Sequence, residues 1–382
     1  MSHPLIYTDE TVEALREQVR RFVETEVVPN GDVWEKGGMV PREVLGKMGE
    51  LGFLGIRYQE KYGGAGLDTV ATVAFVEELS RSTYAGFNIT VLVHTDMASP
   101  HLARFGTSEQ LDRYMPDIVA GRKITGVGVT EPGGGSDVQA LRTRAEKRGN
   151  GWVLNGSKMF ITNGVHGDLF FVAARTDPDA KGSRGISMFI VEKDTPGFRV
   201  GRKLDKMGWR SSDTAELVFE DCELPGDALL GTENRGFYAI MENFQNERIV
   251  LGAMCVGEAQ KAIDLTLDYV KERPAFGARL WDKQAIRQRL AMLQAEVAAA
   301  RQLVYHAAWL DAQGQDATRE VSMVKALCGE LVNRVMYSCQ QFHGGYGYMR
   351  EFPIERMVRD ARIQAIGGGA TEVMLEEVAK RM

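Results

Sequence analysis

The chain has 382 residues, of which 44% are hydrophobic and 26% charged, with a formal net charge of -6 and a pI near 5.7. This length predicts two or three domains with a large buried core. Because no basic block offsets the negative charge, the composition argues against nucleic acid and anionic membrane surfaces as partners.

The cysteines and the N-terminus indicate the compartment. Cys222, Cys255, Cys328 and Cys339 form no CxxC pair, so we expect buried free thiols and neither a disulfide nor a metal site. Residues 1–10 lack the basic and apolar regions of a signal peptide, and no apolar run approaches the roughly 18 residues of a membrane span. We therefore expect a cytoplasmic protein without a membrane span.

Helical patterns fill the first third of the chain. Acidic and hydroxyl residues near the N-terminus, and later a proline, mark two helix starts. We predict helices over residues 8–29, 41–51, 69–82, 88–105 and 109–120, with a glycine-rich loop at 62–66. The sequence therefore predicts a helical N-terminal domain over residues 1–122.

The pattern changes at Lys123, where short runs typical of β-strands begin. They cover residues 124–130, 152–154, 169–174, 186–191 and 216–219, separated by turns rich in glycine and aspartate. Because no helical pattern lies between them, we predict an antiparallel barrel or sandwich rather than βαβ units. This middle β-domain is expected over residues 123–232.

Helical patterns return after Arg235. We predict helices over residues 235–271, 283–312 and 318–341 and from Thr371 onward, interrupted by glycines in the segments 343–347 and 367–369. The third domain is expected over residues 233–382. The order of elements predicts an α+β protein with a β-domain between two helical domains.

Glu247 is the unusual residue of the long helix at 235–271. Ile240, Phe244, Leu251 and Met254 follow a four-three spacing and share an apolar face, and Glu247 falls in the same series. A carboxylate on an apolar face is costly without a partner, and its pKa should rise. It is either a general base or a structural carboxylate at a solvated helix edge, paired with Arg248 or a lysine.

The glycine-rich segment 130–137 follows a strand. Its glycines can bring backbone N–H groups close to a planar or phosphorylated ligand, and Thr130 and Ser136 add hydroxyls. It is neither a Walker A motif nor a Rossmann turn, because the required lysine and the following helix are absent. The alternative is a tight surface turn.

The segment 155–163 has the pattern of a hairpin corner. Phe160 could flank a ring while Thr162 donates a hydrogen bond to it, or both residues could belong to the core of the β-domain. His343, in the later glycine loop, is expected to shape the turn rather than to titrate.

Five motifs resemble those of the acyl-CoA dehydrogenases in order and spacing. They are TEPGGGSD (130–137), LNGSKMFITNG (154–164), GRKLDKMG (201–208), RPAFG (273–277) and QFHGGYG (341–347). The resemblance extends from the first helix to Glu372 and points most to the long-chain and isovaleryl-type members. It implies three domains, the last a four-helix bundle, with bound FAD and a homotetramer. It also implies dehydrogenation of acyl-CoA to the trans-2-enoyl thioester, with electron-transferring flavoprotein as electron acceptor.

The resemblance also implies site residues, carried over by position. The expected cofactor-binding residues are Val127, Val129, Thr130, Gly135, Ser136, Phe160, Ile161, Thr162, Arg273, Phe276, Gln284, Gln341, Phe342, His343, Gly344, Gly345, Ala370, Thr371 and Glu372. Those from Arg273 to Gly345 would reach FAD partly across a subunit interface. The expected substrate-binding residues are Ser136, Tyr238, Gln245, Arg248 and Gly368, and no metal ligand is expected.

The chain departs from the family pattern at the catalytic base. Many members carry this glutamate in a Tyr-Glu-Gly-Thr string before the last helix, where this chain has Gly368, with Ala370 in place of the threonine. In long-chain and isovaleryl-type members the base is the glutamate of a Glu-Arg pair on the long helix, which matches Glu247-Arg248. We therefore expect Glu247 to take the α-proton and the Gly368 N–H to polarise the thioester carbonyl.

The glycines at 367–369 predict a roomy cavity near the reacting carbons, which would suit long or methyl-branched acyl groups. Two other functions stay open. One is a catalytically silent homologue that binds acyl-CoA or flavin, motivated by Gly368. The other is a flavin oxidase or monooxygenase on the same fold.

Overall fold

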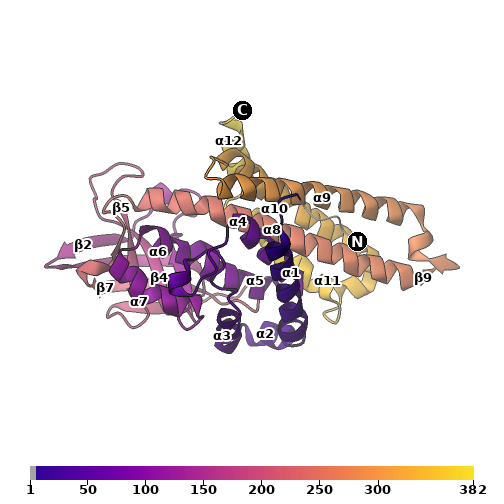
Figure 1. The fold of residues 1–382 in the computed structure, drawn as a ribbon, viewed down its shortest axis with the longest axis horizontal. Helices are drawn as coiled ribbons and strands as arrows, with labels where there is room; N and C mark the ends of the chain where they lie inside the picture. The colour runs from indigo at the N-terminus through magenta and orange to yellow at the C-terminus, as the bar shows by residue number, and fades with distance from the viewer. Residues whose placement is uncertain (1–5) are drawn as a thin grey trace.

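The computed structural model describes residues 6–382 and shows two helical regions with a β region between them. In Figure 1 the β region lies at one end of an elongated molecule, and the long helices α8, α9 and α10 run along it. This confirms the predicted fold class, while the domain boundaries at 122/123 and 232/233 stay a prediction. Residues 1–5, part of the segment used to exclude a signal peptide, lie outside the described part of the chain.

The first region is helical, with short π- and 3₁₀-helices labelled η. Its elements are α1 (Glu10–Phe22), η1 (Val23–Val27), α2 (Gly31–Gly37), α3 (Arg42–Glu50), η2 (Glu60–Tyr62), α4 (Thr69–Leu79), η3 (Ser80–Ser82), α5 (Ala85–Leu92), η4 (Val93–Ala98), α6 (Ser99–Phe105) and α7 (Ser108–Val119). The Asp9 carboxylate caps α1 by accepting the Val12 N–H at 2.9 Å. The sequence missed α2, because glycine at both of its ends weakens a helical pattern.

The middle region forms one eight-stranded sheet. Its elements are β1 (Thr125–Gly128), η5 (Val138–Ala140), β2 (Arg144–Arg148), β3 (Gly151–Thr162), β4 (Leu169–Arg175), β5 (Ile186–Glu192), β6 (Phe198–Lys203), β7 (Thr214–Leu224), η6 (Gly226–Ala228) and β8 (Leu229–Leu230). The order is β6-β7-β3-β2-β4-β5-β8, with β1 beside β4. Most neighbours are antiparallel, as predicted, but β4 pairs in parallel with β1 and β2, because the β2–β3 hairpin intervenes before the chain returns as β4.

Strand β4 is buried on both faces. Leu169, Phe171 and Ala173 pack toward the helices, whereas Phe170 and the other alternating residues belong to a second core inside the β region. This two-sided burial explains the unbroken apolar run in the sequence. The sequence missed β2 and β6, which are rich in arginine and lysine and mostly exposed.

The segment 155–163 was predicted to be a hairpin corner, but residues 155–162 form the second half of the long strand β3. Its pairing with β7 shifts register between Lys158 and Ile161, where Phe160 adopts a left-handed backbone with φ of 63°. Such a bulge re-aims a side chain out of the regular alternation of a strand. The sequence pattern of a corner therefore reflected a bulge.

The last region is helical. Its elements are α8 (Gly236–Glu272), β9 (Pro274–Ala275), β10 (Ala278–Arg279), η7 (Leu280–Asp282), α9 (Gln284–Ala312), α10 (Thr318–His343), η8 (Gly344–Tyr348), α11 (Pro353–Ala361), η9 (Arg362–Ala365) and α12 (Thr371–Ala379). Helix α8 packs against α10, α9 and the fully buried α4, so the two helical regions share one core. α11 was missed by sequence analysis.

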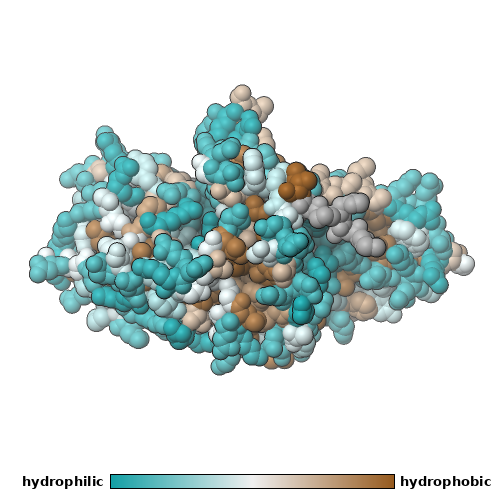
Figure 2. All heavy atoms as spheres, viewed as in Figure 1, coloured by the Kyte–Doolittle hydropathy of each residue, from teal (hydrophilic) through white to brown (hydrophobic). Residues whose placement is uncertain are grey.

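The surface is mixed. Figure 2 shows a mostly hydrophilic face with apolar residues exposed near its centre. Within residues 6–382, no helix combines the length and the apolar character needed to cross a bilayer. All four cysteines are buried and carry free thiols, as expected.

Candidate active site

Glu247 lies on α8 with only 7% of its surface exposed. Burial raises the pKa of its carboxyl to about 8, although the Asn243 amide and the Arg248 guanidinium both act in the opposite direction. No ion pair of Glu247 occurs in the described part of the chain, so the alternative of a solvated, paired carboxylate does not fit. A carboxyl with this pKa can accept a proton near neutral pH.

Asn243 holds the carboxyl of Glu247 in place. Its side-chain NH2 donates to Glu247 Oε1 at 3.1 Å and to the Met97 carbonyl at 2.9 Å. The two side chains meet because they stand one turn apart on the same face of α8. Sequence analysis missed Asn243, although its position four residues before the candidate base was a usable signal.

The π-helix η4 ties the base to the β region. On one side, the Asn246 amide donates to the Asp96 carbonyl at 2.7 Å. On the other side, the His94 ring accepts the N–H of Thr125, the first residue of β1, at 3.1 Å. Burial lowers the pKa of His94 to about 4, so the ring stays neutral and can accept this bond. Helix α8 and the strand leading to the glycine-rich loop are therefore fastened to one segment.

A buried ion pair anchors the glycine-rich loop. The Lys158 ammonium lies 2.7 Å from the Glu131 carboxylate, which also accepts the N–H groups of Arg142 and Thr143. Burial alone would raise the pKa of Glu131, but these donors hold it below its usual value. The carbonyl of Thr130 accepts the Met159 N–H at 2.9 Å. Sequence analysis did not foresee this pair, because the partners are far apart in the chain.

The tip of this loop is open. Residues 132–137 are exposed, and a Cβ atom added to Gly133 would meet nothing within 4 Å. Gly135 and Ser136, both predicted site residues, therefore stand where a ligand can reach the backbone closely. Val127, Val129 and Thr130, on the way into the loop, are half-buried.

Phe160 presents its ring next to this loop. Its side chain is 66% exposed, and it is held in a left-handed backbone that a non-glycine residue adopts only at some cost. An exposed aromatic ring held at a strained position beside an open loop is suited to packing against a flat ligand. Ile161 is only 3% exposed and packs in the β core, so only its main chain can touch such a ligand, whereas Thr162 is half-buried.

Gly368 faces α8 from the turn before α12. Its backbone is left-handed, with φ of 65°, and a Cβ atom built on it would lie 2.3 Å from Leu251 Cδ1. The predicted roomy cavity beside this glycine is therefore wrong at this position, because the Leu251 side chain fills the space. Leu251 stands one turn after Glu247, so the candidate base and Gly368 flank the same leucine.

A second face of α8 carries Tyr238, Gln245 and Arg248, which are spaced by seven and three residues. Gln245 Oε1 and Arg248 Nε are buried and have no hydrogen-bond partner in residues 6–382. Buried polar atoms are normally paired, so these two orphans suit a polar ligand such as the CoA part of a thioester. Tyr238 is exposed, and the Arg235 guanidinium lies over its ring, 4.0 Å from the ring centroid.

The predicted residues at the start of α12 are less uniform. Ala370 is half-buried and precedes the helix, and Glu372 is exposed in its first turn. The Thr371 hydroxyl is already engaged, since it donates to the Glu330 carboxylate at 2.8 Å.

The remaining predicted cofactor residues lie elsewhere. Arg273 follows the C-terminal end of α8, 26 residues after Glu247, which is about 39 Å along the helix axis. Its guanidinium lies over the Tyr346 ring at 5.1 Å, beside the segment 341–345. Figure 1 shows this end of α8, near β9, opposite the β region. Arg273 and the segment 341–345 therefore lie far from Glu247 in the same chain.

This distant group is also open to a ligand. The Phe276 side chain is 96% exposed with φ of 53°, and Gln284, Gln341, Gly344 and Gly345 are exposed. Phe342 is half-buried. His343 differs: its ring is buried, stacks on Tyr269 at 4.4 Å, and its Nδ1 pairs with the Cys339 carbonyl. Its side chain therefore shapes the end of α10, as the turn pattern suggested.

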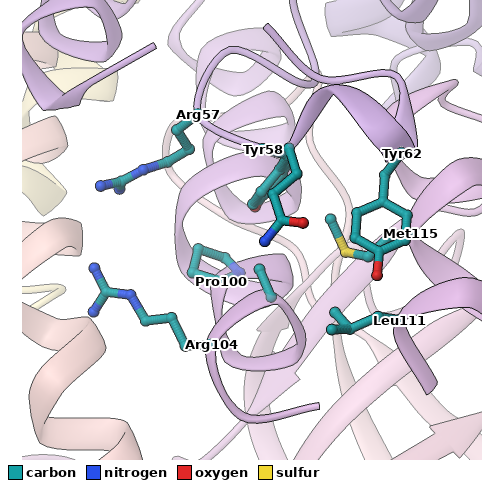
Figure 3. Close-up of a pocket in the computed structure, with 9 residues that line it drawn as sticks. Arg57, Tyr58, Tyr62, Pro100, Arg104, Leu111 and Met115 are labelled. Atoms are coloured by element: carbon teal, nitrogen blue, oxygen red, sulfur yellow. The ribbon is translucent and has the colours of Figure 1, made fainter. Parts of the chain in front are cut away.

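A separate cavity of about 240 Å³ opens among the loop at 57–62, α6 and α7. Figure 3 shows Arg57 and Arg104 at one side of it and Tyr62, Leu111 and Met115 at the other. Arg57 donates to the Asn246 side chain and Arg104 lies 3.4 Å from Glu242, so both reach α8. None of the predicted site residues lines this cavity.

Comparison with known families agrees with the motifs. The chain matches the descriptions "Acyl-CoA dehydrogenase, N-terminal domain" over residues 9–122, "middle domain" over 126–222 and "C-terminal domain" over 234–382.

Curated relatives and solved structures agree as well. The mouse "Long-chain specific acyl-CoA dehydrogenase, mitochondrial" is 42% identical over 96% of this chain and 85% of its own. "Isovaleryl-CoA dehydrogenase, mitochondrial" of Pongo abelii is 36% identical over 97% and 90%. The crystal structure of an acyl-CoA dehydrogenase from Geobacillus kaustophilus superimposes with a TM-score of 0.95 at 42% identity, covering 99% of both chains.

The cofactor follows from the same comparisons. A solved "FAD complex of PigA" has a TM-score of 0.95 and 28% identity, covering 100% of this chain and 99% of its own. The exposed Phe160 ring and the open glycine loop fit such a group. By its motifs, its fold and these matches, the chain belongs to the acyl-CoA dehydrogenase family, whose members use FAD to dehydrogenate acyl-CoA.

Proposed function

We propose that this enzyme dehydrogenates a long-chain or branched acyl-CoA between Cα and Cβ, with Glu247 as the base that takes the α-proton. The observation that carries the proposal is the Glu247 carboxyl, which is buried, has a pKa of about 8 and is oriented by Asn243. Position 368, where many members have their base, holds a glycine against Leu251. Glu247 is therefore the carboxyl that burial and family position both support.

Each residue would contribute a separate part of the reaction. The α-proton of a thioester is a weak acid, so the carbonyl must be polarised while the proton leaves. The Gly368 N–H donates no hydrogen bond within residues 6–382 and is free for the thioester oxygen. Glu247 then accepts the proton in a site that excludes bulk water. FAD, when bound, supplies the acceptor for the β-hydride.

The proposed FAD site lies between two copies of the chain. The glycine loop with Phe160 of one copy would hold the ring system, and Arg273, Phe276 and the segment 341–345 of another would hold the remainder. The strongly exposed Phe160 and Phe276 rings support this arrangement, because one FAD held between two copies would cover Phe160 of one copy and Phe276 of the other. A site shared in this way requires at least two copies, and the family resemblance leads us to propose a homotetramer.

The substrate class rests on the relatives and not on the glycine run. A relative named as long-chain specific is 42% identical, and one named as isovaleryl-CoA dehydrogenase is 36% identical. We also propose electron-transferring flavoprotein as the electron acceptor, which the family resemblance implies. A cytoplasmic location is proposed from the sequence.

An anaerobic titration of FAD absorbance against straight, branched and aromatic acyl-CoAs tests this proposal. Long or branched acyl-CoAs should bleach the flavin fastest, and equal efficiency with a short straight-chain acyl-CoA would overturn the substrate class. If no acyl-CoA bleaches the flavin, the chain is a silent homologue. Rapid peroxide formation from the reduced enzyme in air would instead identify an oxidase.

A further inference from the structure

Lys325 is a fully buried lysine on α10. Its side chain is 1% exposed, and its Nζ donates to the carbonyls of Gln364 at 2.8 Å and Gly369 at 2.6 Å. Within residues 6–382 the ammonium forms no ion pair with a carboxylate. Burying a charge is costly unless strong partners replace water, and here two backbone carbonyls do so.

These two carbonyls enclose the turn that carries Gly368. Gln364 lies in the last turn of η9, where free carbonyls carry partial negative charge and attract a cation. Between them, the N–H groups of Ile366 and Gly367 both donate to the Ile363 carbonyl, at 2.9 and 2.8 Å. The next N–H, that of Gly368, is left unpaired by the turn. The Lys325 ammonium thus holds the backbone by hydrogen bonds on both sides of the free Gly368 N–H.

Lys325 belongs to a stripe of α10 that contacts this backbone. Lys325, Gly329 and Asn333 are spaced by four residues and share one helix face. The Asn333 amide donates to the Ala361 carbonyl at 3.0 Å, and a Cβ atom on Gly329 would lie 2.7 Å from the Gln364 carbonyl oxygen. Of the three, Lys325 is the charged residue and the one that bonds on both sides of Gly368.

We propose that Lys325 is a positioning residue for catalysis: its ammonium fixes the 364–369 turn so that the Gly368 N–H meets the thioester oxygen. The inference rests on the proposed function, in which Gly368 polarises the carbonyl. Lys325 does not touch the reacting atoms. A hydrogen-bond donor displaced by about 1 Å can cost about 100-fold in rate. Loss of the two Lys325 hydrogen bonds should therefore lower kcat and leave KM little changed.

Three variants of the FAD-loaded enzyme test the proposal. Lys325→Met removes the donors at similar size, and Lys325→Arg keeps charged donors. Met336→Ala is the matched control, since Met336 is equally buried on α10 but lies about three turns away. We expect K325M to lower kcat by roughly 10- to 100-fold with little change in KM, K325R to recover part of the loss, and M336A to lower only the melting temperature.

Two further readouts separate positioning from general destabilisation. Hydrogen–deuterium exchange followed by mass spectrometry should show loss of protection at residues 364–370 in K325M but not in M336A. Deuterium uptake at Cα of a 3-thia-acyl-CoA, which has sulfur in place of the hydride-donating carbon, should slow in K325M as kcat does. This second measurement follows proton removal alone.

The outcomes distinguish this inference from the proposed function. If K325M keeps its kcat, its Cα exchange and its protection while Glu247→Gln abolishes turnover, the role of Lys325 is wrong and the proposed base stands. If Glu247→Gln leaves turnover unchanged, the proposed function fails first. Should K325M not fold, Lys325→Gln replaces it, since glutamine keeps a neutral polar group for folding but removes the ammonium that the proposal requires; unchanged kcat and exchange in that variant would equally overturn the proposal.

Discussion

The Cδ1 atom of Leu251 lies 2.3 Å from the place that a Cβ atom on Gly368 would occupy. Leu251 stands one turn after Glu247 on α8, so the same leucine neighbours both the candidate base and the position where many relatives carry theirs. With Leu251 in place, position 368 cannot accept a side chain without repacking. The glycine at position 368 and the glutamate at position 247 are therefore linked through their shared neighbour Leu251.

The first prediction concerns this contact. Gly368→Ala should lower the free energy of unfolding by about 2–4 kcal/mol, because it adds both a clash and a strained left-handed backbone. Gly367→Ala is the control, since a Cβ atom there meets nothing closer than 3.6 Å. Denaturant unfolding of both variants measures the difference. The double variant L251A/G368A should lose less stability than the sum of the losses of the two single variants, because they share one contact. Equal stability of G368A and G367A would contradict the contact.

The second prediction concerns the pH dependence of catalysis. Only the ionised Glu247 can accept a proton, and its pKa is about 8, so kcat/KM should rise with pH and level off above about 8. Asn243 stabilises the ionised form, and Asn243→Leu should therefore move this limb to higher pH. Glu242→Gln, on the exposed face of α8, should leave it unchanged. A limb near the ordinary carboxyl pKa would contradict a buried base.

The third prediction concerns the pH dependence of protein stability, which reports the pKa of the Glu247 carboxyl without substrate. The pKa of Glu247 is raised in the folded state, from an ordinary 4.5 to about 8, so the folded protein binds the extra proton between these values. Its contribution to stability is present below about pH 4.5 and is lost by about 1.4 kcal/mol per pH unit as the pH rises to 8. Glu247→Gln removes this loss. Thermal unfolding should show the variant similar to the wild type at pH 5 and more stable at pH 9; parallel curves would contradict the raised pKa.

The fourth prediction concerns the glycine-rich loop. Lys158→Met leaves the buried Glu131 carboxylate without its cation, which typically costs about 3–5 kcal/mol. The variant should also lose FAD on gel filtration, because Glu131 positions the loop. Adding Glu131→Gln removes the uncompensated charge and should restore much of the stability. Flavin content, read from absorbance, checks both variants, and full FAD retention by K158M would contradict the anchoring role.

Much of the fold could be predicted from local patterns. Helix α8 was predicted to within a residue at each end, because its apolar periodicity is long, and Glu247 was found because it breaks that periodicity. Strands β2 and β6 were missed since exposed strands rich in charge show no apolar alternation. Periodicity thus identifies elements that bury one face and overlooks those that do not.

The parts of the site that depend on distant partners could not be predicted. Asn243 was within reach, one turn from the base, but Lys325 meets its carbonyls about forty residues later in the chain. The glycine run at 367–369 was misleading for a different reason. A missing side chain says nothing about which neighbour fills the space, and here Leu251 fills it.

The most direct test of Glu247 as the base is anaerobic stopped-flow reduction of the bound FAD by a long-chain acyl-CoA. Wild type, Glu247→Gln and the control Glu242→Gln are compared at pH 8, with flavin content and melting temperature confirming that each variant is folded and loaded. We predict that flavin bleaching in E247Q is about 10²- to 10⁴-fold slower than in the wild type. E242Q should bleach at the rate of the wild type. Bleaching by E247Q at a rate within a few-fold of the wild type would contradict the account.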